Sequence, residues 1–123
     1  MAKRRKIGRG LRLSVVGGAV CAWCQWPAVP GPEDGPEYAM AIRRFVEAGE
    51  AWRIPLRNQL QVDHIVPVHL GGTNHQGNLR PLCSRCNRVK GRRSDDEIGG
   101  RDAVLSRRRA MAERFIRLSG AAR

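Results

Sequence analysis

The residues best suited to chemistry lie in the segment QVDHIVPVHLGGTNHQGNLRPLCSRCNRVKGRR, residues 61–93. Asp63 and His64 are adjacent there, and Asn87 directly follows a Cys-x-x-Cys pair. Phosphodiester cleavage needs an activated water and a Lewis acid on the phosphate. Histidine is the natural base near neutral pH, and carboxylate and amide oxygens suit a hard cation such as Mg²⁺. The segment therefore predicts a metal-dependent nuclease centre, with His64 directed at water and with Asp63 and Asn87 as ion ligands.

Four cysteines form two Cys-x-x-Cys pairs, Cys21 with Cys24 and Cys83 with Cys86. Such a pair turns both sulfurs toward one tetrahedral centre, so the two pairs predict a closed zinc site that serves folding. Buried free cysteines or two disulfides are the alternatives. A reducing compartment disfavours the disulfides. Because the insert between the pairs is long, it must fold as a subdomain while its ends are tied together.

The elements around these residues follow from alternation and turn residues. Residues 60–66 and 79–82 are expected to be strands, with Gly71-Gly72 as a turn between them, and a helix is expected from Asn87. Asn78 enters the second strand, where its amide can bond to backbone groups and hold the loop after His64. Strand, loop, strand and helix together predict a ββα unit, and hence an α+β fold with flanking helices.

The remaining chain is assigned more coarsely. The alternation of Leu11, Leu13 and Val15 suggests a short strand, and Ser94 with Glu97 resembles a helix capping box. Three- and four-residue spacing of apolar residues predicts helices over residues 37–52 and 101–118, with Val104, Met111, Phe115 and Leu118 on one face of the last helix and its arginines mostly elsewhere. The expected division is a basic arm (1–20), a nuclease core with zinc clamp (21–93) and a basic C-terminal helix (94–123).

The chain of 123 residues has a net charge of +12, which makes nucleic acid its default partner. Any single basic cluster is more commonly a solvated face, but two acid-free clusters favour phosphate binding. No apolar run approaches a membrane-spanning length, and Arg12 interrupts the only stretch that resembles a secretory signal, so a cytoplasmic location is expected. The candidate DNA-binding residues are Arg80, Arg85, Arg88, Lys90, Arg92 and Arg93.

Residues 62–90 resemble the His-Asn-His (HNH) endonuclease family of ββα-metal nucleases. The resemblance is carried by Asp63-His64-Ile65-Val66-Pro67, Gly71-Gly72, Asn78-Leu79, Leu82-Cys83-x-x-Cys86-Asn87 and Lys90. It implies His64 as general base, Asp63 and Asn87 as divalent-ion ligands, Asn78 as the orienting residue and the four cysteines as a zinc site. The third motif position, His in many members, is Asn87 here, and this all-oxygen site favours Mg²⁺ or Mn²⁺.

The leading hypothesis is thus a small HNH endonuclease that nicks or cuts double-stranded DNA with little base readout. A compact, arginine-rich nuclease of this kind resembles those that bacteriophages encode beside their DNA-packaging genes, which suggests the terminase large subunit as a partner. The alternative is a zinc-stabilised nucleic-acid-binding or assembly accessory protein without turnover. An RNA-directed protein is the third hypothesis.

Overall fold

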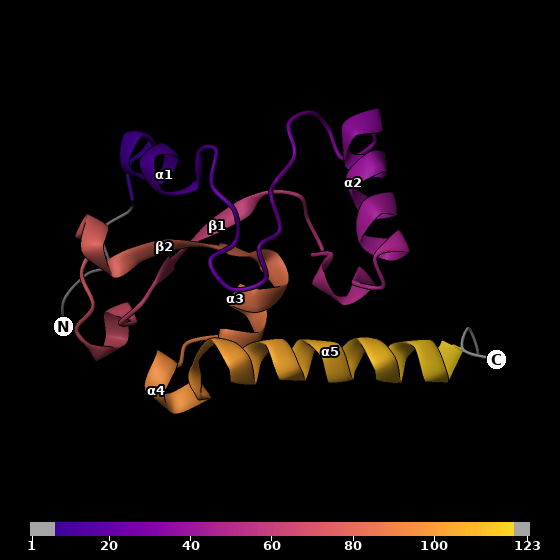
Figure 1. Cartoon of the computed structure of the whole chain (residues 1–123). Helices are drawn as coiled ribbons and strands as arrows, with labels where there is room; N and C mark the ends of the chain where they lie inside the picture. The colour runs from indigo at the N-terminus through magenta and orange to yellow at the C-terminus, as the bar shows by residue number, and fades with distance from the viewer. Residues whose placement is uncertain (1–6, 120–123) are drawn as a thin grey trace.

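The computed structural model describes residues 7–119, with the side chains of 116–119 left aside. At its centre is a two-stranded antiparallel sheet of β1 (Leu60–His64) and β2 (Leu79–Cys83). Leu60 pairs with Cys83 and His64 with Leu79. Helix α3 (Ser84–Lys90) begins directly after β2, as Figure 1 shows. The predicted ββα unit is therefore confirmed.

The hydrophobic core includes the four cysteines and, from the two strands, Leu60 and Leu82. Trp26, fully buried, contacts Tyr38 edge-on and Phe45 at a tilt, with ring centroids 5.9 and 5.2 Å away. Both partners lie on α2 (Pro36–Glu47). This helix ends before Gly49, which has a φ of 73° that favours glycine, and a 3₁₀ turn, η1 (Ala51–Arg53), follows. The helix predicted over 37–52 is thus two elements.

The predicted strand near residue 11 is wrong, because α1 (Arg9–Val16) is helical. Leu11 and Val15 alternate with Leu13, but they also stand four residues apart, which places them on one helical face. Val15 is buried whereas Leu13 is 56% exposed, so the helical spacing decides. Helix α1 packs against both strands. The basic residues 3–6 of the predicted arm lie outside the described residues.

After α3 the chain forms two further helices, α4 (Asp95–Ile98) and α5 (Gly100–Ser119). The predicted capping box is confirmed: Ser94 Oγ accepts from the Glu97 amide, and Glu97 accepts from the Ser94 amide. The predicted apolar face of the last helix is only partly correct. Val104 is fully buried, but Met111 and Phe115 are 52% and 72% exposed, where α5 extends beyond α3 and α4 (Figure 1).

Two short 3₁₀ turns, η2 (Val68–Leu70) and η3 (Gln76–Asn78), shape the loop between the strands. The loop closes tightly at Gly72, where a Cβ would lie 1.6 Å from the Val66 carbonyl oxygen. Only glycine fits this approach. In the described part of the chain, no helix is long and apolar enough to span a bilayer.

Candidate active site and metal centre

The two Cys-x-x-Cys pairs meet in one buried cluster. All four cysteines are 0% exposed, and their sulfurs lie within 4.8 Å of one another. In each pair the second cysteine's backbone N–H donates to the first sulfur at 3.4 Å, which folds the pair into a knuckle. Tetrahedral zinc bonds of about 2.3 Å would place the sulfurs about 3.8 Å apart. The donor set and its spacing fit a structural metal such as zinc.

The electrostatics of the cluster also favour a cation. Hydrogen bonds with Cys24, Cys83 and Cys86 hold the pKa of Cys21 well below its ordinary value, whereas the hydrogen bond with Cys21 is the main cause of a raised Cys86 pKa. Neighbouring thiols in so small a volume cannot all ionise without a compensating charge. A bound divalent metal supplies that charge.

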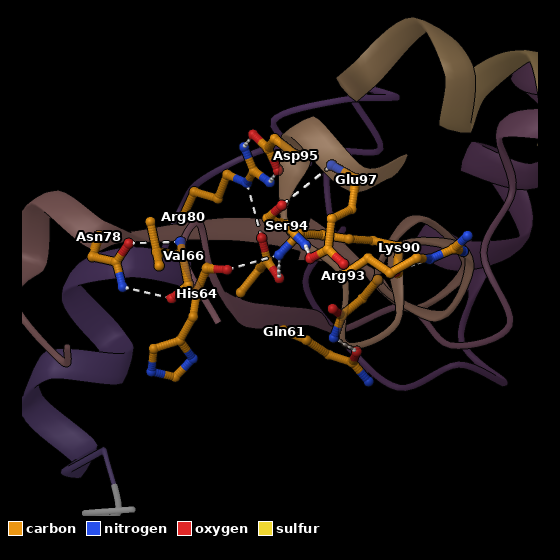
Figure 2. Close-up of polar contacts among 12 residues, drawn as sticks. Gln61, His64, Val66, Asn78, Arg80, Lys90, Arg93, Ser94, Asp95 and Glu97 are labelled. Carbon is orange, nitrogen blue, oxygen red and sulfur yellow. Dashed lines mark hydrogen bonds and ion pairs between the residues drawn. The ribbon is translucent and has the colours of Figure 1, made fainter. Parts of the chain in front are cut away.

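Asn78 ties the loop after β1 to itself, as predicted. Its Oδ1 accepts from the Val66 amide at 2.8 Å, and its Nδ2 donates to the Val66 and Thr73 carbonyls at 3.1 and 2.9 Å. Figure 2 shows its amide facing Val66. In addition, the Asn78 carbonyl accepts from the Ile65 amide at 2.8 Å. These bonds fix the backbone immediately after His64.

His64 is the last residue of β1 and is 7% exposed. Its Nε2 lies 2.7 Å from Asn74 Oδ1. With that oxygen as acceptor, Nε2 carries the proton and Nδ1 keeps its lone pair. The ring points away from Gln61 and Lys90 (Figure 2). The sequence analysis missed Asn74, because a single polar residue in a loop gives no indication of its partner.

Asp63 is held in a buried network of charges. It is 5% exposed, its Oδ1 accepts from Lys90 Nζ at 2.9 Å, and its Oδ2 accepts from Arg80 Nε at 2.9 Å. Lys90 Nζ also donates to the His64 carbonyl at 2.7 Å. Arg80 continues to Asp95 through two further bonds (Figure 2) and stacks on Trp23. The network thus connects both strands, α3 and α4.

This network changes the assignment of two predicted DNA-binding residues. Lys90 is 1% exposed, and the Arg80 side chain is 15% exposed. Both direct their charges at carboxylates inside the fold, because the ββα unit packs them against Asp63. We therefore treat Lys90 and Arg80 as parts of the scaffold and not as phosphate contacts.

Asn87 lies on the face of α3 that covers β1. Its Nδ2 donates to Gln61 Oε1 at 2.6 Å, and Lys90, one turn later, reaches Asp63. Gln61 and Asp63 share one face of the strand because their spacing is two. The structure thus brings Asn87 and Asp63 to the same face of β1, while His64 projects from the other.

The other predicted DNA-binding residues differ in exposure. Arg88 and Arg92 are exposed, whereas Arg85 is half-buried, and burial followed by the charge of Arg108 lowers its pKa. Arg93 donates to the Lys90 and Val89 carbonyls and so caps the end of α3. Arg88 and Arg92 are the members of the set whose charges remain directed to solvent.

Comparison with known proteins agrees with this architecture. The HNH endonuclease family model matches residues 51–93, which include η1, the hairpin and α3. Neither the search of curated proteins nor the search of solved structures produced a match. The hairpin, the loop held by Asn78 and the helix that carries Asn87 all fall within the matched residues. Over residues 51–93, the chain is therefore similar to the HNH endonuclease family.

Proposed function

We propose that this chain is a metal-dependent endonuclease that hydrolyses phosphodiester bonds in double-stranded DNA, by nicking or double-strand cutting, with low sequence specificity. The observation that carries the proposal is the HNH domain, in which His64 stands at the end of β1 beside a loop fixed by Asn78. The net charge of +12 supports a polyanionic substrate. A cytoplasmic location, and assistance to phage DNA packaging through the terminase large subunit, belong to the same proposal.

In this mechanism His64 is the general base. Asn74 holds Nε2, so Nδ1 is the atom free to take a proton from the attacking water. Asn78 holds the backbone that follows His64 in place while the phosphate binds. Arg88 and Arg92, exposed on and just after α3, supply charge for the DNA backbone.

Asn74 is expected to be a positioning residue for His64. Asn74→Ala should slow cleavage on the order of 10–100-fold, because the imidazole loses its orientation, while DNA affinity is retained. Asn74→Asp keeps an oxygen acceptor and should preserve the tautomer with hydrogen on Nε2. Nitrogen-15 NMR of the His64 ring reports the tautomer directly. If Asn74→Ala kept the His64 tautomer and the cleavage rate of the wild type, Asn74 would have no positioning role.

The ion ligands are proposed to be Asp63 and Asn87. Their oxygens suit Mg²⁺ or Mn²⁺, which when bound would polarise the scissile phosphate. The structure adds one condition, because both Asp63 oxygens already accept from cations. A divalent ion must therefore compete with the Lys90 ammonium. The hydrogen bond from Nδ2 to Gln61 leaves the Asn87 amide oxygen as its remaining donor atom for an ion.

Lys90→Met tests this competition. Removing the ammonium leaves Asp63 with one cationic partner, and breaking a buried pair costs about 3–5 kcal/mol. With the zinc site loaded and no Mg²⁺ or Mn²⁺ added, the variant should melt well below the wild type, and either ion should raise its melting temperature more than that of the wild type. Arg88→Met, exposed on the same helix, is the matched control. If neither ion stabilises Lys90→Met selectively, Asp63 is not an ion ligand.

The ion pairs that Lys90 and Arg80 form with Asp63 also favour the second candidate function, a zinc-stabilised DNA-binding accessory protein without turnover. In that case Asp63 serves only the scaffold, as its two ion pairs allow. The protein would then bind DNA through its exposed arginines, and cleavage would not appear with any ion.

A supercoiled-plasmid assay separates these functions. With the zinc site loaded, the endonuclease should nick plasmid in Mg²⁺ or Mn²⁺ and should be inactive when neither ion is added. Activity with Ni²⁺ or Zn²⁺ alone would contradict the all-oxygen ion site. DNA binding without cleavage in every ion would establish the accessory function, and preferential cutting of RNA at the same salt concentration would redirect the proposal to RNA.

A further inference from the structure

Arg108, in the middle of α5, is buried although it belongs to a run of three arginines. It is 3% exposed, whereas Arg107 and Arg109 on either side are exposed. Its hydrogen-bond partners are two sulfurs and a carbonyl: Nη1 donates to Cys86 at 3.1 Å and to Cys83 at 3.5 Å, and Nη2 donates to the Trp52 carbonyl at 2.8 Å. Its Cζ also lies 5.9 Å from the centroid of the Trp52 ring. Within residues 7–119, its charge is not matched by any carboxylate ion pair.

Burying a guanidinium without a counter-charge is costly. A neutral thiol is a weak acceptor and offers no negative charge, whereas a thiolate offers both. A divalent metal bound by four thiolates keeps a net charge of −2, and one adjacent guanidinium reduces it to −1. The buried position of Arg108 is therefore explained if the cysteines are ionised around a metal.

We propose that Arg108 is an outer-sphere partner of a tetrathiolate zinc centre and that zinc thereby fastens α5 to the nuclease domain. The guanidinium bridges three parts of the chain, because it reaches the second cysteine knuckle and Trp52 from a helix that follows residue 93. Hydrogen bonds to metal-bound sulfur remove electron density from it and stabilise the thiolate form. Zinc loading and the docking of α5 are then coupled.

The proposal is tested by measuring the zinc affinity of the 123-residue chain in competition with a chromophoric chelator. Arg108→Met should bind zinc about 10–100-fold more weakly than the wild type. Arg107→Met removes the same charge from an exposed position of the same helix and should leave the affinity unchanged. Arg108→Lys should fall between them, because lysine keeps the charge but lacks the planar fork. If packing alone mattered, Met and Lys would have equal effects.

A second measurement uses the wild-type chain with ¹¹³Cd²⁺ in place of zinc. A scalar coupling between cadmium and the Arg108 Nη protons across the N–H···S bond is expected. Its absence would overturn the proposal, and so would equal zinc affinities of folded Arg108→Met and Arg107→Met. Should Arg108→Met fail to fold, the cadmium experiment on the wild-type chain still decides the question. Neither measurement depends on DNA cleavage, so each tests this proposal independently of nuclease activity.

Discussion

His64→Ala is expected to cleave supercoiled plasmid about 10²–10⁴-fold more slowly than the wild type, because the proposed general base is lost. The ring stands at the end of β1 and bonds to Asn74, so its removal leaves the hairpin ladder and the Asn78 bonds in place. DNA affinity should therefore stay near that of the wild type. Single-turnover cleavage with excess protein, beside a binding isotherm at the same salt concentration, measures both.

The matched control is His69→Ala. His69 is exposed in η2 of the same loop, so its loss removes an imidazole without touching the His64–Asn74 pair. It should cut at a rate close to the wild type. Comparable rates for the wild type and His64→Ala would contradict the role of His64, and a general loss of DNA binding in His64→Ala would point to a damaged fold instead.

The second large effect is expected from loss of the structural metal. Structural zinc contributes on the order of 10–16 kcal/mol in small zinc-binding peptides, as much as or more than the roughly 5–15 kcal/mol that stabilises a typical domain. The cysteines lie inside the hydrophobic core and join the segment before α2 to the start of α3. Cys83→Ser, or a strong chelator, should therefore abolish the cooperative thermal transition followed by circular dichroism.

The structural metal is distinguished from the proposed catalytic ion by testing which of the two restores the thermal transition. After chelation, zinc should restore the transition, whereas Mg²⁺ should not, because thiolates are soft ligands that hard cations avoid. Metal analysis should find one zinc per chain in the recovered protein. A metal-free protein with the melting temperature of the loaded form would exclude the folding role of the cluster.

Residue spacing was sufficient to predict those parts of the structure in which the interacting residues are close in sequence. The ββα unit followed from alternation, two glycines and a cysteine knuckle, and the capping box followed from two residues three apart. The assembly of the four cysteines followed from chemistry, because a paired motif needs a common ion. Each of these inferences rests on a few residues whose geometry the chain itself constrains.

The contacts of charged residues were not predictable in this way. The arginines of the last helix were expected to lie mostly away from its apolar face, yet Arg108 stands four residues after Val104 and is buried with it. Its partners are 22 and 25 residues away at the sulfurs, and only tertiary packing brings them together. Lys90 was similarly expected to reach phosphate, and its burial depends on where α3 crosses β1.

The network around Asp63 has a consequence for the divergence of this domain. One carboxylate compensates Lys90 and Arg80, which lie on different elements, and Arg80 in turn depends on Asp95. Replacing Asp63 alone would leave the buried Lys90 ammonium without its carboxylate partner and Arg80 with Asp95 alone. We therefore expect positions 63, 80, 90 and 95 to vary jointly among homologues, so that a neutral residue at 63 accompanies the loss of at least one of the two cations.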